Sequence, residues 1–278
     1  MVDRGVVCYG RAMNTPSTSG KRGLTALVVL LVIASLGTTA WWVYWFASGS
    51  NTHGALCDRV YENSFPVGDM VMAGFVMATA VQVIRRRASA LFLGFAAAGM
   101  SLDLAVLDTA HNLFTGAFHA PIGTVIQKAV FAVVNGAVGV GTLVLLSRDR
   151  ADFPWAGSGV ASPIAAGLSG VATVFGLGLI AAYIRLAGAR PECAHLVEVP
   201  FAAPLLLLSL LGLAAAVLRA RPLALAAGGS LIHAGLVGTF YALANRDIVP
   251  MVGLIVAVGG ATLGVAILTA SRESRPAA

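Results

Sequence analysis

The sequence predicts an all-α membrane protein, a polytopic bundle of eight transmembrane helices. Of its 278 residues, 58% are hydrophobic and only 11% are charged, and the mean hydropathy is +0.86. A soluble domain carries about a quarter charged residues. The apolar residues are also gathered into long runs, and an apolar run of about 18 residues or more is typical of a transmembrane helix.

Eight such runs follow one another and leave no room for a soluble domain. In order, they cover residues 24–47, 66–84, 88–114, 121–146, 163–184, 200–218, 222–244 and 249–270. The first closes with WWVYWF, which suits the aromatic belt at a membrane interface. A signal peptide cleaved after Ala40 is the less favoured alternative, because the apolar run continues past it. The polar segments 1–22 and 272–278 are expected to be tails, the first of them disordered.

Basic residues between the runs predict the orientation, because cytoplasmic loops carry an excess of Lys and Arg. If the N-terminus is cytoplasmic, thirteen basic residues fall inside and four fall outside. The inner set is Arg4, Arg11, Lys21, Arg22, Arg85, Arg86, Arg87, Arg148, Arg150, Arg219, Arg221, Arg272 and Arg275, and the outer set is Arg59, Arg185, Arg190 and Arg246. We therefore predict a multi-pass protein of the cell membrane with both termini cytoplasmic. The net charge of +6 then indicates contact with anionic lipid and not with nucleic acid.

An internal repeat is predicted when the sequence is shifted by 134 residues. AVQVIRRRASALFLG (80–94) then aligns without a gap with AAAVLRARPLALAAG (214–228). Two parallel four-helix repeats, 23–150 and 151–271, would follow, related by an axis along the membrane normal. Chance similarity between Ala- and Leu-rich helices is the alternative. The membrane carboxylates of the first repeat have apolar counterparts in the second: Asp69 falls on Ala203, Asp103 on Val237 and Asp108 on Ala242.

The third run contains the polar stretch SLDLAVLDTAHNLF at 101–114. At about 1.5 Å per residue, Asp103 would lie near the midplane, with Asp108 and His111 nearer the outer interface. A charge in hydrocarbon costs about 2.5–3.5 kcal/mol, so such residues usually mark functional sites. The candidate catalytic residues are Asp69, Asp103, Asp108 and His111, and the candidate substrate-binding residues are Asn63, Asn112, Lys128, Asn135 and His233.

Structural roles for these polar residues remain open alternatives. Lys128 is the only cation within a predicted span, so an Asp–Lys pair between helices would simply lock the bundle. Asp69 would in that case cap the helix that begins at Pro66, and His233 would be a hydrogen-bonded core histidine. With three carboxylates and one lysine, at least one Asp is expected to hold a proton or to reach water.

The cysteines and histidines are candidates for a disulfide, a redox pair or a metal site. Cys57 and Cys193 fall in outer loops at nearly equivalent repeat positions, so a disulfide between the halves is predicted. A redox pair is less favoured, because no Cys-X-X-Cys is present. The outer histidines have no metal-ligand spacing, and the sequence lacks a P-loop, HExxH or GxSxG motif. We therefore predict neither a metal nor a cofactor.

Two segments, YENSFPVGDM (61–70) and LDTAHNLFTGAF (107–118), resemble a pattern in uncharacterised bacterial membrane proteins built from one four-helix unit. In those proteins the pattern begins one helix and ends the next. The matching residues are Asn63, Phe65, Pro66, Asp69, Asp108, Asn112 and Gly116. The resemblance implies a four-helix unit, here duplicated, and supports the polar site without implying an activity.

Three classes of function fit these observations. The first is a small transporter with Asp103 and Asp108 coupling protons or cations to a substrate held between the halves. The second is a membrane enzyme acting on a lipid or isoprenoid by general acid–base chemistry at Asp108 or Asp69. The third is an accessory protein whose polar cluster holds helices together. The expected partners are the lipid bilayer and a small or lipophilic substrate.

Overall fold

The chain is helical wherever regular structure is described in the computed structural model, which describes residues 18–52, 59, 61–116, 119, 121–153, 160–187, 194–244 and 251–272. The long helices are α1 (Thr18–Ala47), α3 (Pro66–Ile84), α4 (Ser89–Phe114), α5 (Ile122–Arg148), α6 (Pro163–Ala187), α7 (Ala194–Leu218), α8 (Arg221–Ala244) and α9 (Met251–Arg272), and the short 3-10 helix η2 (Arg150–Asp152) follows α5. Six of the eight contain spans long and apolar enough to cross a membrane. The prediction of an all-helical, multi-pass membrane protein is confirmed.

Helix boundaries follow the predicted apolar runs closely, with two differences. The first turn of α1 begins at Thr18, inside the segment predicted to be a tail. Pro200 lies inside α7, which begins at Ala194, although the prediction started this helix at the proline. A membrane helix tolerates an internal proline because neighbouring groups can satisfy the freed carbonyl. A Pro at the first position does begin α3 and α6, where the missing N–H costs nothing.

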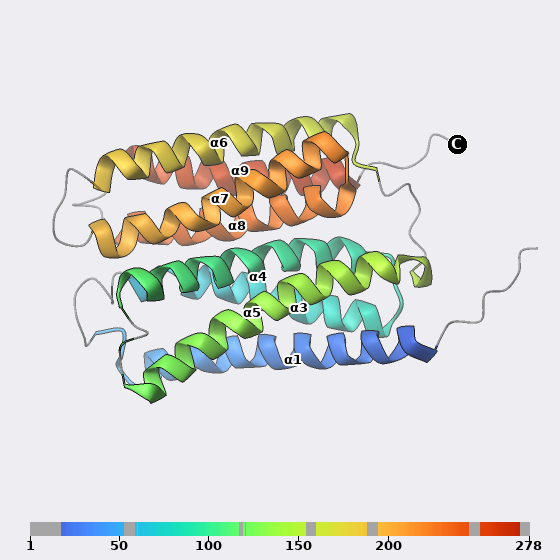
Figure 1. The fold of residues 1–278 in the computed structure, drawn as a ribbon, viewed down its shortest axis with the longest axis horizontal. Coiled ribbons are helices and arrows are strands. Elements are labelled where there is room, and N and C mark those ends of the chain that lie inside the picture. The colour runs from blue at the N-terminus through green and yellow to red at the C-terminus, as the bar shows by residue number, and fades with distance from the viewer. Residues whose placement is uncertain are drawn as a thin grey trace, which may run out of the picture.

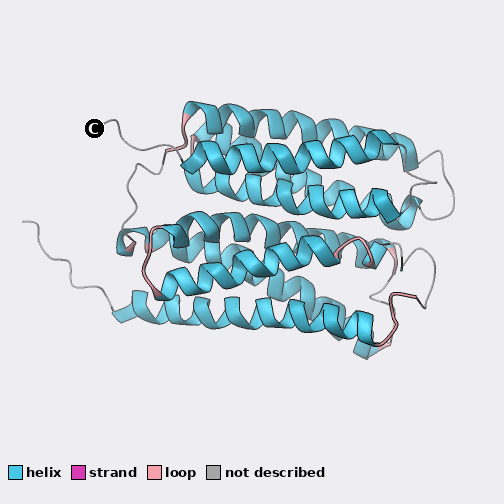
Figure 2. Ribbon diagram, turned by 180° about the vertical axis from the view of Figure 1, so that it is seen from behind, coloured by secondary structure: helices cyan, strands magenta, loops and turns pink. Residues whose placement is uncertain are grey.

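The helices form two groups of four that lie side by side (Figures 1 and 2). The first half contains α1, α3, α4 and α5, and the second half contains α6 to α9. The halves meet where α4 packs against α7 and α8 and where α3 packs against α8. The helices alternate in direction, so α1 begins and α9 ends at the same end of the bundle (Figure 1). We call the end marked by Trp42 and Trp45 the tryptophan end, and the opposite end, with residues 85–87, the arginine end.

Tight turns at the arginine end join α3 to α4 and α7 to α8. After α3, the Arg86 N–H donates to the Val83 carbonyl and the Arg87 N–H donates to the Gln82 carbonyl. This is the Schellman pattern of helix ends, which normally uses glycine at the left-handed position. Here Arg86 occupies that position with φ 49°, and Arg219 has φ 48° in the second turn. The two turns thus share a strained arginine.

The backbones of the two halves approach closely at the crossing of α4 and α8. A Cβ added to Gly99 would overlap the backbone of Ala226, and one added to Gly229 would overlap the backbone of Ala96. The contact is reciprocal and relates positions 130 residues apart. That is one helical turn less than the shift of 134 in the sequence alignment, so the predicted repeat stays a prediction.

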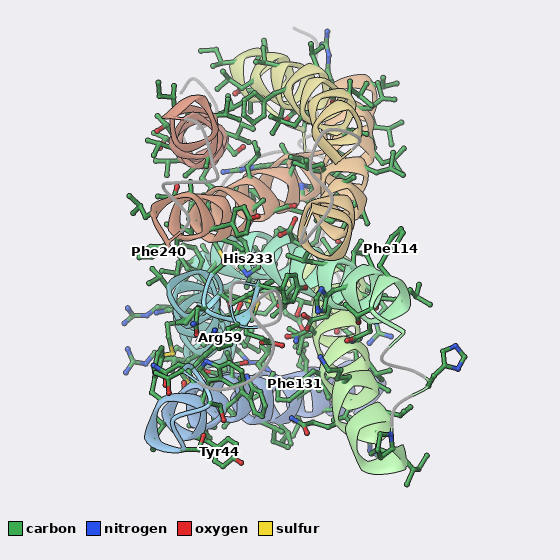
Figure 3. All side chains as sticks on the ribbon, turned by 90° about the vertical axis from the view of Figure 1, so that its left-hand side faces the viewer. Tyr44, Arg59, Phe114, Phe131, His233 and Phe240 are labelled. Carbon is green, nitrogen blue, oxygen red and sulfur yellow. The ribbon has the colours of Figure 1, made fainter. Side chains whose placement is uncertain are left out.

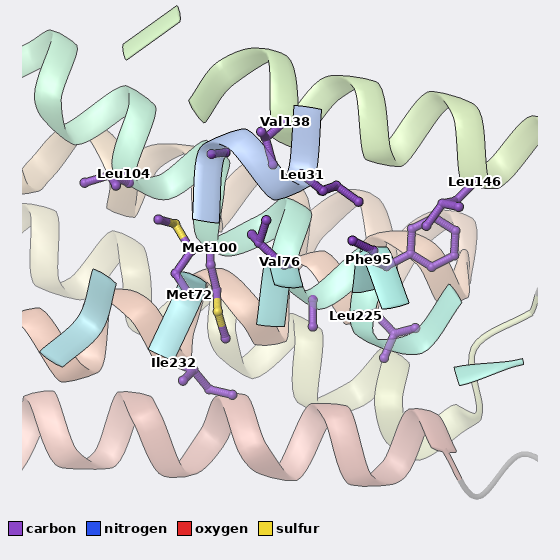
Figure 4. Packing of buried hydrophobic residues seen from close by; sticks show 14 of the residues in the cluster. Leu31, Met72, Val76, Phe95, Met100, Leu104, Val138, Leu146, Leu225 and Ile232 are labelled. Carbon is purple, nitrogen blue, oxygen red and sulfur yellow. The ribbon is translucent and has the colours of Figure 1, made fainter. Parts of the chain in front are cut away.

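Buried apolar side chains fill the first half and its contact with α8 (Figure 4). Met72 and Val76 of α3 lie among Phe95 and Met100 of α4 in this cluster, together with Ile232 of α8. A second apolar cluster lies within α6 to α9. The first cluster borders Asp69, Asp103 and His233 on the side of the arginine end.

Candidate functional site

The imidazole of His233 bridges two aspartates of the other half. Its Nδ1 lies 2.8 Å from Oδ2 of Asp103, and its Nε2 lies 3.1 Å from Oδ1 of Asp69. The three residues come from α8, α4 and α3, so they join the two halves where these pack together. His233 and Asp103 are fully buried, and Asp69 is nearly so. Figure 3, viewed along the helices from the tryptophan end, places His233 between the two groups of helices.

The remaining carboxylate oxygens are also hydrogen-bonded. Ser230 donates its hydroxyl to Oδ1 of Asp103 at 2.8 Å. Trp42 donates its indole N–H to Oδ2 of Asp69 at 3.0 Å. Each of the four oxygens therefore has a partner. We call Trp42, Asp69, Asp103, Ser230 and His233 the Asp–His–Asp network.

Local sequence explains how the network is assembled. Asp69 lies in the first turn of α3, three residues after the Pro66 that begins the helix. Gly68 beside it permits α8 to approach, because a Cβ there would lie 2.8 Å from Val237 and 3.5 Å from the His233 ring. On α8, Ser230 and His233 are three residues apart and so face the same side of the helix.

The proton count of the network follows from its geometry. Each N···O contact of His233 needs one proton between the two atoms. Two protons are thus shared by one imidazole and two carboxylates, and the three groups carry a net charge of −1 wherever these protons lie. Such a charge in a buried site is stable only while every contact is kept, because an unpaired buried charge is costly.

A second group of polar side chains lies nearer the tryptophan end. The Tyr61 ring stacks on the His111 ring, with centroids 3.5 Å apart and planes inclined by 6°. The Tyr61 hydroxyl donates to the carbonyl of Leu107 at 3.5 Å. Lys128 Nζ lies 3.8 Å from Oε1 of Glu62. Residues 61–70 and 107–116, which belong to the two segments with the pattern described above, therefore lie against each other.

Asp108 lies between this group and the network. It is partly exposed, and its carboxylate makes no hydrogen bond or ion pair with any residue that the structure describes. Glu62, Asp69, Lys128 and His233 all lie within its electrostatic reach. Asp108 is thus a carboxyl group free to bind a proton or a cation, while the buried aspartates are already engaged.

The structure brings together Asp69, Asp103 and His233, three of the nine candidate site residues, and two of the structural alternatives are not seen. Asp69 does not cap α3, where no side chain makes a capping hydrogen bond. Lys128 pairs with Glu62 instead of with a membrane aspartate, because it lies on α5 near the bundle surface.

The other candidates lie apart from the network. The Asn63 amide oxygen accepts from the Trp45 indole at 3.0 Å, and Asn135 donates to the Phe131 carbonyl of its own helix at 3.0 Å. His111 and Asn112 are buried near the tryptophan end. Cys57 and Cys193 lie outside the described residues.

Sequence reasoning did not find Trp42, Ser230, Tyr61 or Glu62. The three tryptophans of α1 are typical of an interfacial belt, and serine is common in membrane helices, so neither residue type indicates a site. The one usable signal was the spacing of Ser230 and His233, which face the same side of α8. Among the residues that the structure covers, no group of three or more His, Cys, Asp or Glu side chains is arranged to hold a metal ion.

Comparison of the chain with known protein families, with curated proteins and with solved structures gives no match. The class of protein therefore comes from the fold and the site alone. The chain is a multi-pass helical membrane protein in which a buried carboxylate–imidazole network joins the two halves.

The two indole hydrogen bonds of α1 offer a matched test of this network. Trp42 donates to a buried carboxylate, and Trp45 donates to the partly buried amide of Asn63. Trp42→Phe is expected to lower the free energy of unfolding by about 1.5–3 kcal/mol, as for hydrogen bonds to charged groups. Trp45→Phe is expected to cost about 0.6 kcal/mol, as for neutral bonds in membranes. Unfolding in mixed detergent micelles measures both, and equal costs would contradict a charged Asp69.

Proposed function

We propose that the protein is a proton-coupled transporter of small solutes and that the Asp–His–Asp network carries the proton. The observation that supports this most is the bridge itself. His233 of the second half contacts Asp69 and Asp103 of the first half at 3.1 and 2.8 Å. Membrane-embedded Asp and His side chains are typical of proton relays in pumps and transporters.

The bridge links protonation to movement of the halves. If the halves separate, both His233 contacts break and leave charged groups unpaired in a buried site. Breaking a buried pair in this way costs about 3–5 kcal/mol. Protons taken up by Asp69 and Asp103 would remove their charges and most of that cost. Separation of the halves is therefore coupled to proton uptake, which is the requirement for proton-driven transport.

The arrangement of the halves suits alternating access. We propose that they are parallel repeats that rock about the close contact of Gly99 with Ala226, with the substrate between them. We also propose that both termini are cytoplasmic in a bacterial cell membrane, so that the tryptophan end faces outward. The distribution of Arg and Lys in the sequence supports that orientation.

A structural role is the second candidate, and one observation favours it. All four oxygens of Asp69 and Asp103 are hydrogen-bonded, as expected of a lock between helices. A membrane enzyme is less well supported, because a general acid or base must reach its substrate and Asp69, one of the two candidate groups for this chemistry, is enclosed. The other candidate, Asp108, is partly exposed.

Flux measurements distinguish a transporter from a protein in which the network only holds the helices together. Purified protein is placed in liposomes that contain a pH-sensitive dye, and a panel of amino acids, sugars, amines and organic acids is added one at a time. For a transporter, at least one solute moves protons with the wild type, and Asp103→Asn reduces this flux to that of protein-free liposomes. Asp149→Asn is the control, because the Asp149 carboxylate accepts from Arg148 at the arginine end, away from the network. No flux with any solute, together with loss of folded Asp103→Asn protein, would favour the lock.

A further inference from the structure

We propose that protons reach the Asp–His–Asp network from the tryptophan end only, through Asp108 and the neighbouring Tyr61 hydroxyl. This inference deepens the proposed function, because it assigns the side of the membrane with which the proton site exchanges. It rests on the described contacts at the two ends of the network.

Asp108 occupies the position that such a route requires. It follows Asp103 by five residues on α4, which places it about 7.5 Å further toward the tryptophan end. It is partly exposed, whereas Asp103 is fully buried. Its carboxylate has no hydrogen-bond partner among the described residues, and Glu62 and Asp69 both act on it electrostatically. A proton held at Asp108 is thus between the surface and the network.

The Tyr61 hydroxyl lies 3.5 Å from the carbonyl of Leu107, the residue that precedes Asp108. Asp108, Glu62 and Asp69 all act on it electrostatically, and its ring is held against His111. Burial, together with these three negative charges, raises the pKa of Tyr61 well above its ordinary value of 10.0. The hydroxyl therefore keeps its own proton and can pass one on only by accepting another at the same time, as a relay does.

The outer limit of the route is the pair of Glu62 and Lys128. Their side chains are 23% and 30% exposed, so both reach the surroundings of the bundle. At 3.8 Å the pair is long for an ion pair, and Glu62 can exchange protons with water. The charged groups that act electrostatically on Asp108 from neighbouring elements are Glu62 and Asp69 from the segment 61–69, Lys128 from α5 and His233 from α8. Asp108 acts in turn on the Tyr61 hydroxyl.

The opposite side of the network is apolar. From the network to the arginine end, residues 72–84 of α3, 89–102 of α4 and 222–229 of α8 contain no titratable side chain. Met72 and Met100 lie directly on that side, with Val76, Phe95 and Leu225 beyond them, and all five are buried (Figure 4). A proton has no acidic or basic group to occupy there. The network is therefore closed toward the arginine end in this conformation.

The test follows proton binding through Trp42, whose indole N–H contacts Asp69. A protein with Trp42 as its single tryptophan, made by Trp41→Phe, Trp45→Phe and Trp155→Phe, is placed in lipid nanodiscs. Stopped-flow jumps in pH then report the rate at which the network gains or loses protons. Asp108→Asn is expected to slow the fluorescence change by at least about tenfold while leaving its end points unchanged. Asp152→Asn, in η2 beyond α5, is the matched control and should keep the unmodified rate.

Three further variants keep the test decisive. Tyr61→Phe retains the ring that stacks on His111 and lacks only the hydroxyl, so it should also slow exchange. Asp108→Glu retains the carboxyl group and should restore the rate. If Asp108→Asn and Tyr61→Phe both exchange at the unmodified rate, or if Ser101→Ala toward the arginine end slows exchange instead, the route is wrong. These rates do not depend on any transported solute, so an absence of solute-linked flux would overturn the proposed function and leave this inference standing.

Discussion

Replacing His233 with alanine is expected to lower the free energy of unfolding by about 3–5 kcal/mol, the cost of removing one partner from a buried ion pair. The substitution leaves Oδ1 of Asp69 and Oδ2 of Asp103 without their partner at a depth where water does not replace it. Deletion of the ring also leaves a cavity, which adds to the loss. Unfolding of the purified protein by a strong detergent in mixed micelles measures the effect.

A triple variant separates the charge from the cavity. Asp69→Asn and Asp103→Asn remove both negative charges but keep an amide oxygen that accepts from Trp42 and Ser230. His233→Leu then fills much of the space of the ring with an apolar side chain. Replacing a whole buried ion pair by groups that match is often neutral or stabilising. The triple variant is therefore expected to be more stable than His233→Ala, and equal instability of the two would mean that packing and not charge explains the loss.

The helices were predicted well because their signal is local. An apolar run long enough to cross a bilayer can be read from composition alone, and α3 begins and ends at the predicted residues, Pro66 and Ile84. The depth of Asp103 in the membrane was predicted in the same way from the rise per residue, and it stays a prediction. These properties need no knowledge of which helix lies next to which.

The partners of the site could not be predicted, because they depend on the register between helices. When the sequence is shifted by 134 residues, Asp103 aligns with Val237, so its counterpart in the second half is apolar. The reciprocal contact of α4 with α8 relates positions 130 apart instead, and Asp103 then corresponds to His233. The two shifts differ by one helical turn, and this turn decides whether the counterpart of Asp103 on α8 is Val237 or His233. Apolar periodicity is nearly unchanged by one turn, so the sequence contains no signal that separates the two registers.

Trp42 illustrates the same limit on a single helix. Its position near the end of an apolar run predicts a membrane interface, and that assignment stays a prediction. Its indole N–H, however, points into the bundle and donates to Asp69 at 3.0 Å. Trp45, one turn later, donates to Asn63 at the surface side of the same end. Only the rotation of α1 about its axis distinguishes these roles, and it is set by packing against α3.

Gly99→Ala is expected to be the most damaging single-methyl change in the contact between the halves. The added Cβ would overlap the carbonyl group of Ala226, and backbone cannot move aside as a side chain can. Overpacking of this kind typically costs about 1–3 kcal/mol and more where no side chain can yield. We expect a loss of about 3 kcal/mol or more, together with reduced transport, because separation of α4 from α8 also draws His233 away from Asp103.

A glycine-to-alanine change at Gly74 should change the free energy of unfolding in the opposite direction, so it serves as a control. A Cβ added to Gly74 of α3 meets nothing within 4 Å, so Gly74→Ala only replaces a poor helix former by a good one. That change is expected to raise the free energy of unfolding by about 0.5–1 kcal/mol. Gly229→Ala, which would overlap the carbonyl of Ala96, should behave like Gly99→Ala. If all three glycine variants instead unfold alike in mixed micelles, α4 and α8 do not approach each other at these residues, and the register that brings His233 to Asp103 would be wrong.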